Sequence, residues 1–131
     1  MRKVFMFLAF ILFLGINSFA QSLYVCERYD EKYGPIGVSN AFTTGYVTVV
    51  VESNSLMYYD FVYVQYDRMD KDGEYRFYKQ FPFTFPNGHK IVYFSRSVNN
   101  DMEFNHTGNY IVWLLNKNKK VIAYTYIKIV N

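Results

Sequence analysis

Residues 109–130, NYIVWLLNKNKKVIAYTYIKIV, decide the fold class of this chain. Two runs of β-branched and aromatic residues, 109–116 and 120–130, flank the polar residues 117–119. Such runs favour extended strands, and a polar break of this length is typical of a hairpin connection. We therefore predict two paired antiparallel strands at the C-terminal end of the chain.

The same kind of pattern recurs upstream, whereas no segment carries a sustained helical stripe of apolar residues. The clearest alternation spans residues 45–52, where Val47, Val49 and Val51 share one side. Further strands are predicted at residues 22–28, 60–68, 74–81 and 90–96, with connections or short extended pieces at 30–40, 82–88 and 97–105. About seven strands without a helix predict an all-β fold, an antiparallel β-sandwich.

Alternation also predicts which side chains enter the core. Val62, Val64 and Tyr66 form one inward set, and Tyr75, Phe77 and Phe81 form another. Lys79 falls on the same side as the second set. An inward charge of this kind is typical of an edge strand, where it blocks pairing with another chain.

Two stretches near the C-terminus carry a family resemblance. Residues 107–115, TGNYIVWLL, followed by 118–123, NKKVIA, resemble the closing hairpin of bacterial immunoglobulin-like sandwiches, which begins with Gly-x-Tyr, here Gly108 to Tyr110. The resemblance implies an immunoglobulin-like architecture and no particular activity. The same stretch, with the tail at residues 128–130, KIV, is similar to the end of sorting domains used in type IX secretion, which implies a role in envelope sorting.

The first 20 residues have the features of a cleaved export signal. Arg2 and Lys3 precede an apolar run at residues 4–15, which is shorter than the roughly 20 residues that a membrane-spanning helix needs. Ser18 and Ala20 give the small, any, small pattern before a cleavage site. We predict a signal peptide at 1–20 and one sandwich domain at 21–131, exported to the periplasm or outside the cell, with membrane contact only before cleavage.

Composition limits the function classes. Hydrophobic residues make up 51% of the chain and aromatic residues 21%, enough for a packed core. Without Arg2 and Lys3 the chain has 12 basic and 11 acidic side chains, so nothing indicates nucleic-acid binding. Cys26 is the single cysteine, so no internal disulfide forms, and it is predicted as a half-buried strand residue.

Catalytic and metal-binding patterns are weak. The two histidines, His89 and His106, lie in predicted turns without other ligands at zinc-like spacing. Four acidic residues between 67 and 74 lack the spacing of a calcium loop and predict a polar hairpin tip. We therefore expect no cofactor, no metal and no catalytic residue.

Aromatic side chains are the remaining candidates for a site. If the inward sets are right, five of them point away from the core: Tyr63, Tyr78, Trp113, Tyr124 and Tyr126. They are either cross-strand pairs that stabilise the sheet or a face that binds a protein or a glycan.

These observations favour an exported, non-enzymatic binding or interaction module of the bacterial cell envelope. The alternatives are a small secreted hydrolase with dispersed carboxylates, or an envelope sorting or assembly module.

Overall fold

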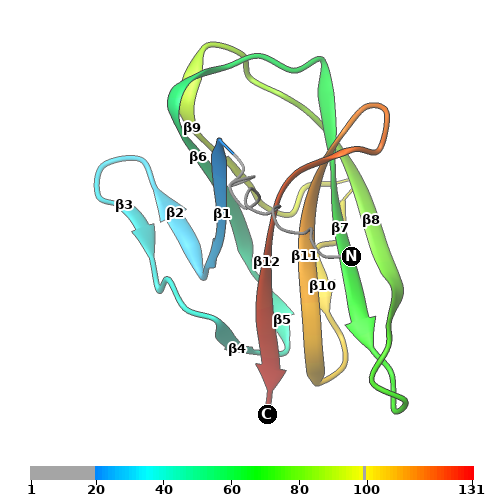
Figure 1. Ribbon diagram of the computed structural model, residues 1–131. Helices are drawn as coiled ribbons and strands as arrows, with labels where there is room; N and C mark the ends of the chain where they lie inside the picture. Colours follow the sequence, from blue (N-terminus) through cyan, green and yellow to red (C-terminus); the bar gives the residue numbers. More distant parts are fainter. Residues whose placement is uncertain (1–19, 99) are drawn as a thin grey trace, which may run out of the picture.

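The computed structural model describes residues 20–98 and 100–131, and within them the chain forms strands that pack as a sandwich (Figure 1). The strands are β1 (Gln21–Cys26), β2 (Arg28–Asp30), β3 (Gly34–Ile36), β4 (Ala41–Thr43), β5 (Gly45–Tyr46), β6 (Thr48–Met57), β7 (Phe61–Met69), β8 (Tyr75–Thr84), β9 (His89–Phe94), β10 (Glu103–Phe104), β11 (Gly108–Asn116) and β12 (Val121–Val130). The predicted hairpin is β11 with β12.

Two sheets make up the sandwich. One has the order β1-β6-β9 and the other β4-β12-β11-β7-β8, and the short pairs β2-β3 and β5-β10 stand beside them. Of the seven long strands, β1, β6 and β9 are therefore in one sheet, and β7, β8, β11 and β12 are in the other. This is the division of strands in an immunoglobulin-like sandwich with one added strand. The predicted all-β sandwich is confirmed.

Two details of the prediction need correction. The described residues contain twelve strands rather than about seven, because five further pieces of only two or three residues are also paired: β2 with β3, β5 with β10, and β4 with β12. In addition, β4 runs parallel to β12, with Ala41 beside Lys128, so the sandwich is not wholly antiparallel.

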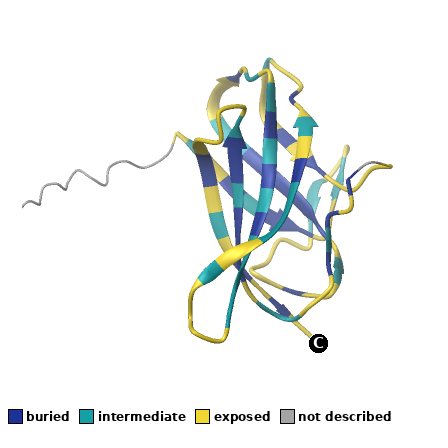
Figure 2. Cartoon of the chain, turned by 90° about the vertical axis from the view of Figure 1, so that its right-hand side faces the viewer, coloured by how far each residue is buried: buried dark blue, intermediate teal, exposed yellow. Residues whose placement is uncertain are grey.

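The inward residues follow the predicted alternation on β6, β7 and β11. Val49, Val64 and Val112 are completely buried. Buried and half-buried residues alternate over the first part of β7, whereas Val50 on β6 and Ile111 on β11 are buried although they point outward. In Figure 2 buried segments are interspersed with half-buried and exposed ones along the strands. Phe81 is also in the core, as predicted. These apolar contacts hold the two sheets together without a disulfide.

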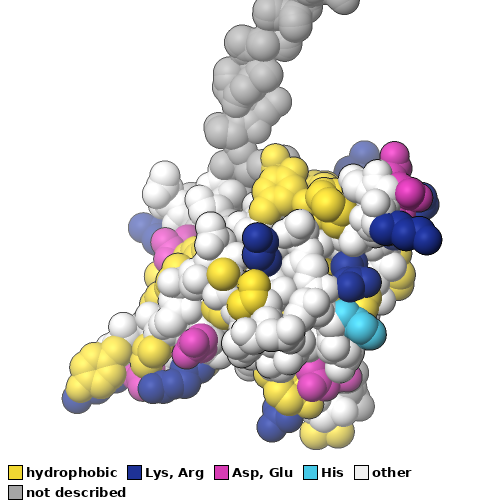
Figure 3. Space-filling view, turned by 90° about the horizontal axis from the view of Figure 1, so that it is seen from below, with side chains coloured by type: hydrophobic (Ala, Val, Ile, Leu, Met, Phe, Trp, Pro, Cys, Tyr) yellow, Lys and Arg dark blue, Asp and Glu magenta, His cyan; other side chains and the backbone are white. Residues whose placement is uncertain are grey.

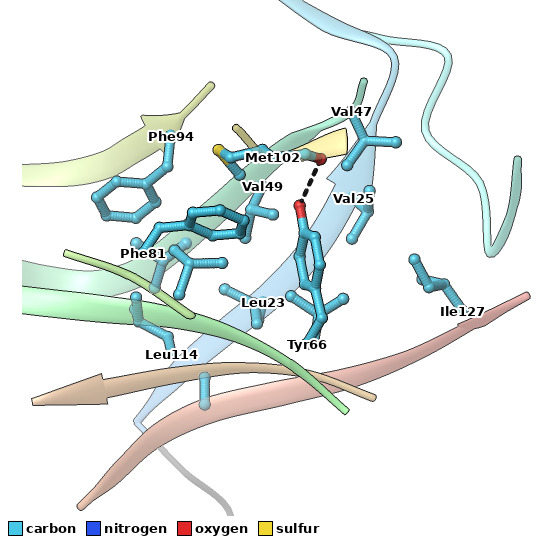
Figure 4. Close-up of a cluster of buried hydrophobic side chains, with 14 of the residues drawn as sticks. Leu23, Val25, Val47, Val49, Tyr66, Phe81, Phe94, Met102, Leu114 and Ile127 are labelled. Carbon is cyan, nitrogen blue, oxygen red and sulfur yellow. Dashed lines mark hydrogen bonds between the residues drawn. The ribbon is translucent and has the colours of Figure 1, made fainter. Parts of the chain in front are cut away.

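Residues 97–105 are more than the polar connection that the sequence predicts. Met102 and Phe104 are fully buried, and Phe104 stacks on Tyr66 with ring centroids 4.1 Å apart. The Tyr66 hydroxyl donates to the backbone oxygen of Met102 at 3.0 Å (Figure 4). The two apolar residues therefore fill the core between the sheets, although polar neighbours conceal them in the sequence.

A β-bulge changes the predicted orientation of residues on β8. Tyr66 is opposite Lys79 and Asp67 is opposite Phe77, so Tyr78 is the extra residue. Phe77, predicted inward, is therefore 63% exposed, and Tyr78, predicted outward, packs against the core.

Lys79 keeps its predicted edge position. Strand β8 is the last strand of its sheet, and Lys79 lies directly opposite the inward Tyr66. Its ammonium donates to the backbone oxygen of Glu103 and to Asn105 Oδ1, both at 2.7 Å. Oxygen atoms of the segment that precedes β11 thus accept hydrogen bonds from the inward ammonium.

The β2-β3 hairpin lies against the outward side of the three-stranded sheet. Tyr29 of β2 stacks on Tyr93 of β9 with centroids 4.3 Å apart. Val50, directly opposite Tyr93, is completely buried, and so is Cys26, which the sequence predicted as only half-buried. The hairpin thus adds local cover that alternation alone does not predict.

The predicted signal peptide lies, apart from Ala20, outside the described residues. Within residues 20–98 and 100–131 there is no helix of the length and hydrophobicity needed to cross a membrane.

Tyr110 joins the start of β11 to the loop before it. Its buried ring lies in the core, and its hydroxyl donates to the backbone oxygen of His106 at 2.6 Å. A tyrosine near the start of this strand, bonded to backbone a few residues upstream, is the tyrosine corner of immunoglobulin-like sandwiches. The Gly-x-Tyr pattern therefore has a structural role here.

We predict that this corner makes stability depend on pH in the alkaline range. Burial raises the pKa of Tyr110 from 10.0 to about 12. Because the folded chain keeps the phenol neutral, its contribution is complete below about pH 10 and is lost as the pH rises to about 12. Tyr110→Phe should lower the free energy of unfolding by about 1–2 kcal/mol at neutral pH and flatten the alkaline loss, as measured by chemical unfolding at several pH values.

Tyr33→Phe is the matched control, because the Tyr33 ring is 73% exposed. It should change neither quantity. Equal destabilisation by the two substitutions would contradict a specific role for the corner.

Candidate functional site

The outward side of the five-stranded sheet, here called the outer face, carries the predicted aromatic residues of the last two strands. Trp113 of β11 lies opposite Tyr124 of β12, and Ile111 lies opposite Tyr126. Tyr124 is 40% exposed and Tyr126 55%, whereas the alternate residues of β11 are buried in the core. The predicted pairing and outward direction of these residues are confirmed.

Four rings follow one another across this face and form what we call the aromatic row: Tyr75, Tyr126, Tyr124 and Trp113. Ring centroids are 6.1 Å apart between Tyr75 and Tyr126, 5.8 Å between Tyr126 and Tyr124, and 5.3 Å between Tyr124 and Trp113. Each spacing is within the range of interacting aromatic pairs. The row is therefore a continuous surface built from three strands.

Tyr75 is the member of the row that sequence reasoning missed. Alternation placed it inward together with Phe77 and Phe81. It lies opposite Met69 at the start of β8, where the β7-β8 hairpin coils, and its ring reaches Tyr126 on β12. A bulge between Tyr75 and Phe81 breaks the regular alternation on which the prediction depended.

Trp113 is held in place by a carboxylate. Its Nε1 donates to Asp67 Oδ2 at 2.9 Å, and the other carboxylate oxygen accepts from Gln65 Nε2 at 2.9 Å. Gln80 Nε2 donates in turn to Gln65 Oε1 at 2.7 Å, and Lys119 Nζ donates to Gln80 Oε1 at 3.2 Å. This polar chain crosses the outer face and uses most of its hydrogen-bonding groups internally.

Tyr63 and Tyr78 do not join the aromatic row. Tyr63 is on the outer face but half-buried, with the Lys119 ammonium 4.4 Å above its ring. Tyr78 leans on the core, with its ring 5.3 Å from that of Tyr110. The structure thus brings together three of the five predicted residues.

A groove of about 420 Å³ runs beside the row. Tyr75 and Tyr126 flank it, and Asn40, Asn109 and Lys128 add polar groups. Lys128 is the one charged residue among those that line it. Figure 3 looks at this end of the molecule and shows hydrophobic side chains next to clusters of basic and acidic ones.

The hairpin tip is polar and holds its own charges. Asp70 Oδ2 accepts from Arg76 Nε at 2.6 Å, and Asp70 Oδ1 accepts from the backbone nitrogens of Asp72 and Glu74. The Arg76 hydrogen bond, with help from these amides, lowers the pKa of Asp70. In the part of the chain that the structure describes, no three His, Cys, Asp or Glu side chains gather where a metal ion could bind.

The histidines are on the surface, as the sequence suggests. His89 and His106 are exposed, and His106 Nδ1 lies 3.3 Å from the Tyr78 hydroxyl. The exposed His106 ring and the Tyr78 hydroxyl thus form a surface contact.

Comparisons with known proteins add little. No family model and no curated protein matches the chain. Among solved structures, it is similar to an immunoglobulin-like protein from Pseudomonas aeruginosa, at 8% sequence identity and a TM-score of 0.46, over 84% of this chain and 91% of that chain. The assignment of the sandwich rests on strand order and on the tyrosine corner.

Asp67 should control the environment of Trp113, which is the only tryptophan of the chain. Asp67→Ala removes the acceptor of the indole N–H. We expect a loss of about 1 kcal/mol, reduced by the partial exposure of the pair, together with a red shift of tryptophan emission. Thermal unfolding and fluorescence spectra measure the two effects.

Asp72→Ala, also on the β7-β8 hairpin, serves as the control. Its side chain is exposed at the tip and should affect neither stability nor emission. An unchanged spectrum in Asp67→Ala would mean that the hydrogen bond does not fix the indole.

Proposed function

We propose that this protein is an exported, non-enzymatic binding module of the bacterial cell envelope and that its outer face binds a partner protein. The observation that carries the proposal is the aromatic row, in which partly exposed rings lie next to a tryptophan fixed by Asp67. Monomers rarely leave such a surface uncovered.

The chemistry of the face favours a protein over a glycan. Asp67, Gln65 and Gln80 are bonded to one another or to Trp113 and Lys119. Few of their donors and acceptors are therefore left for sugar hydroxyls, whereas the half-exposed Tyr126 offers its ring for apolar contact. Tyrosine and tryptophan with restricted rotamers are the residues enriched in the energetic centres of protein interfaces.

The groove suggests the charge of the partner. Lys128 is the charged residue of its lining, and Tyr75 and Tyr126 form its aromatic walls. An acidic side chain of a partner would therefore be attracted into it, because the ammonium supplies an opposite charge at close range.

Two alternative functions, an envelope sorting or assembly module and a small hydrolase, differ from this proposal. The resemblance of the C-terminal stretch to sorting domains supports an envelope sorting or assembly role, in which the same face would contact the secretion machinery. A hydrolase is less well supported, because Asp67, the carboxylate at the centre of the face, already accepts two hydrogen bonds.

Tyr126→Ala should weaken partner binding by at least tenfold, about 1.4 kcal/mol or more, with little change in melting temperature. The reason is that more than half of the Tyr126 ring is exposed, so its removal costs contact area and hardly affects the core. A photo-reactive residue at position 126 of the exported chain would first capture the partner, and the purified partner would then be titrated against the wild type and the variant.

Tyr33→Ala is the matched control, because Tyr33 is an exposed ring on the β2-β3 hairpin. It should bind as the wild type does. Equal affinity of Tyr126→Ala would contradict the proposed face, and capture of a glycan or of a second copy of the chain at position 126 would contradict a separate protein partner.

Export predicts a definite mature N-terminus. Cleavage after Ala20 should give a chain that begins at Gln21, measured as the intact mass of protein recovered from the envelope or medium. A mass that includes residues 1–20, or a lipid attached to Cys26, would contradict soluble export.

A further inference from the structure

A second hollow lies at the loop end of the sandwich, where the β6-β7, β8-β9 and β11-β12 connections meet at the top of Figure 1. It measures about 300 Å³. Tyr58 and Asp60 come from the first connection, Asn87 from the second and Lys117 from the third. Phe61, the first residue of β7, and Asn116, the last residue of β11, complete the lining. Segments far apart in the sequence thus build one concave surface, distinct from the outer face.

Specific hydrogen bonds fix the walls of this hollow. Asn87 Oδ1 accepts from the backbone nitrogen of Tyr59 at 2.7 Å, and Lys117 Nζ lies 2.6 Å from Asp60 Oδ2. Asn116 Oδ1 accepts from the backbone nitrogens of Asn118 and Lys120 at 2.9 and 3.0 Å. The first connection is therefore bonded to both the second and the third, and Asn116 fixes the third by local hydrogen bonds. These contacts are in place before any ligand binds.

The same bonds determine which polar groups are free. Because the amide oxygens of Asn87 and Asn116 accept backbone N–H groups, their NH₂ groups are the part left to contact a ligand. Neither NH₂ group donates a hydrogen bond within residues 20–98 and 100–131. Lys117 has further N–H donors beyond its contact with Asp60. The hollow thus offers several donors to an acceptor-rich ligand.

An exposed ring completes the hollow. Tyr58 is 65% exposed, although it lies in a lining with half-buried Phe61. Its ring presents an apolar surface beside the donors of Asn87 and Lys117. A ligand that matches this combination has one apolar face and many oxygen acceptors, which is the chemistry of a sugar ring.

We propose that this hollow binds a terminal saccharide unit of a glycan, stacked on Tyr58 and hydrogen-bonded by Asn87, Asn116 and Lys117. Its volume is at the lower end of the range for ligand pockets, which suits one or two sugar rings. The site is separate from the outer face. There the polar groups are bonded to one another, whereas here the amide NH₂ groups of Asn87 and Asn116 donate no hydrogen bond to another described residue.

The probes are a set of neutral hexoses, N-acetylhexosamines and uronic acids as mono- and disaccharides, measured with the full mature chain by ligand-observed NMR and titration calorimetry. We expect at least one class to bind and Tyr58→Ala to weaken it by tenfold or more with an unchanged melting temperature. Lys117→Met should weaken uronic acids more than neutral sugars, since it removes the positive charge.

Tyr126→Ala and Tyr33→Ala are the matched controls and should leave saccharide binding unchanged. Absence of binding by every saccharide, or equal affinity of Tyr58→Ala, would overturn the proposal. Loss of saccharide binding in Tyr126→Ala would place the saccharide on the outer face and overturn both assignments. If Tyr126→Ala loses only the binding of the partner protein, the result supports two separate sites. Capture of a peptide in place of sugars at the loop end would also overturn it.

Discussion

Strand β11 is hydrogen-bonded along both sides, to β12 and to β7, and this double pairing fixes the direction of each of its side chains. Tyr110, Val112 and Leu114 enter the core, while Ile111, Trp113 and Leu115 point to the outer face. A slip of one residue would exchange the two sets. Both the tyrosine corner and the position of the only tryptophan therefore depend on one register.

The outer face is more than the solvent side of a sheet. Ile111 and Leu115 point outward but are only 6% and 7% exposed, because aromatic and polar neighbours cover them. The molecule thus has a thin second layer of apolar contacts outside its core. Rings in such a layer have restricted rotamers, which reduces the entropy lost when a partner covers them.

The sequence was sufficient to predict strands and the direction of their side chains where the strands are long and their residues alternate regularly. The β11-β12 hairpin, the inward residues of β6 and β7, and the outward Trp113, Tyr124 and Tyr126 follow from a period of two. The prediction failed where local geometry departs from that period. The bulge at Tyr78 reverses two side chains, and single apolar residues such as Met102 enter the core from a polar segment.

The loop-end hollow was beyond sequence reasoning for a different reason. Its residues lie in or directly beside three connections separated by up to some sixty positions, and none forms a motif. Only the sandwich topology brings Tyr58, Asn87 and Lys117 to the same end. Tyrosine and asparagine in such connections otherwise indicate nothing more than turns.

The environment of Cys26 determines how the stability of this protein responds to redox conditions. It is the single cysteine, it is completely buried, and its Sγ donates to the backbone oxygen of Arg28 at 3.3 Å. Burial raises the pKa of the thiol, so little reactive thiolate forms at neutral pH. With no crosslink between its sheets, the folded state draws no stability from a reducible bond, and the redox poise of its surroundings leaves its folding equilibrium unchanged.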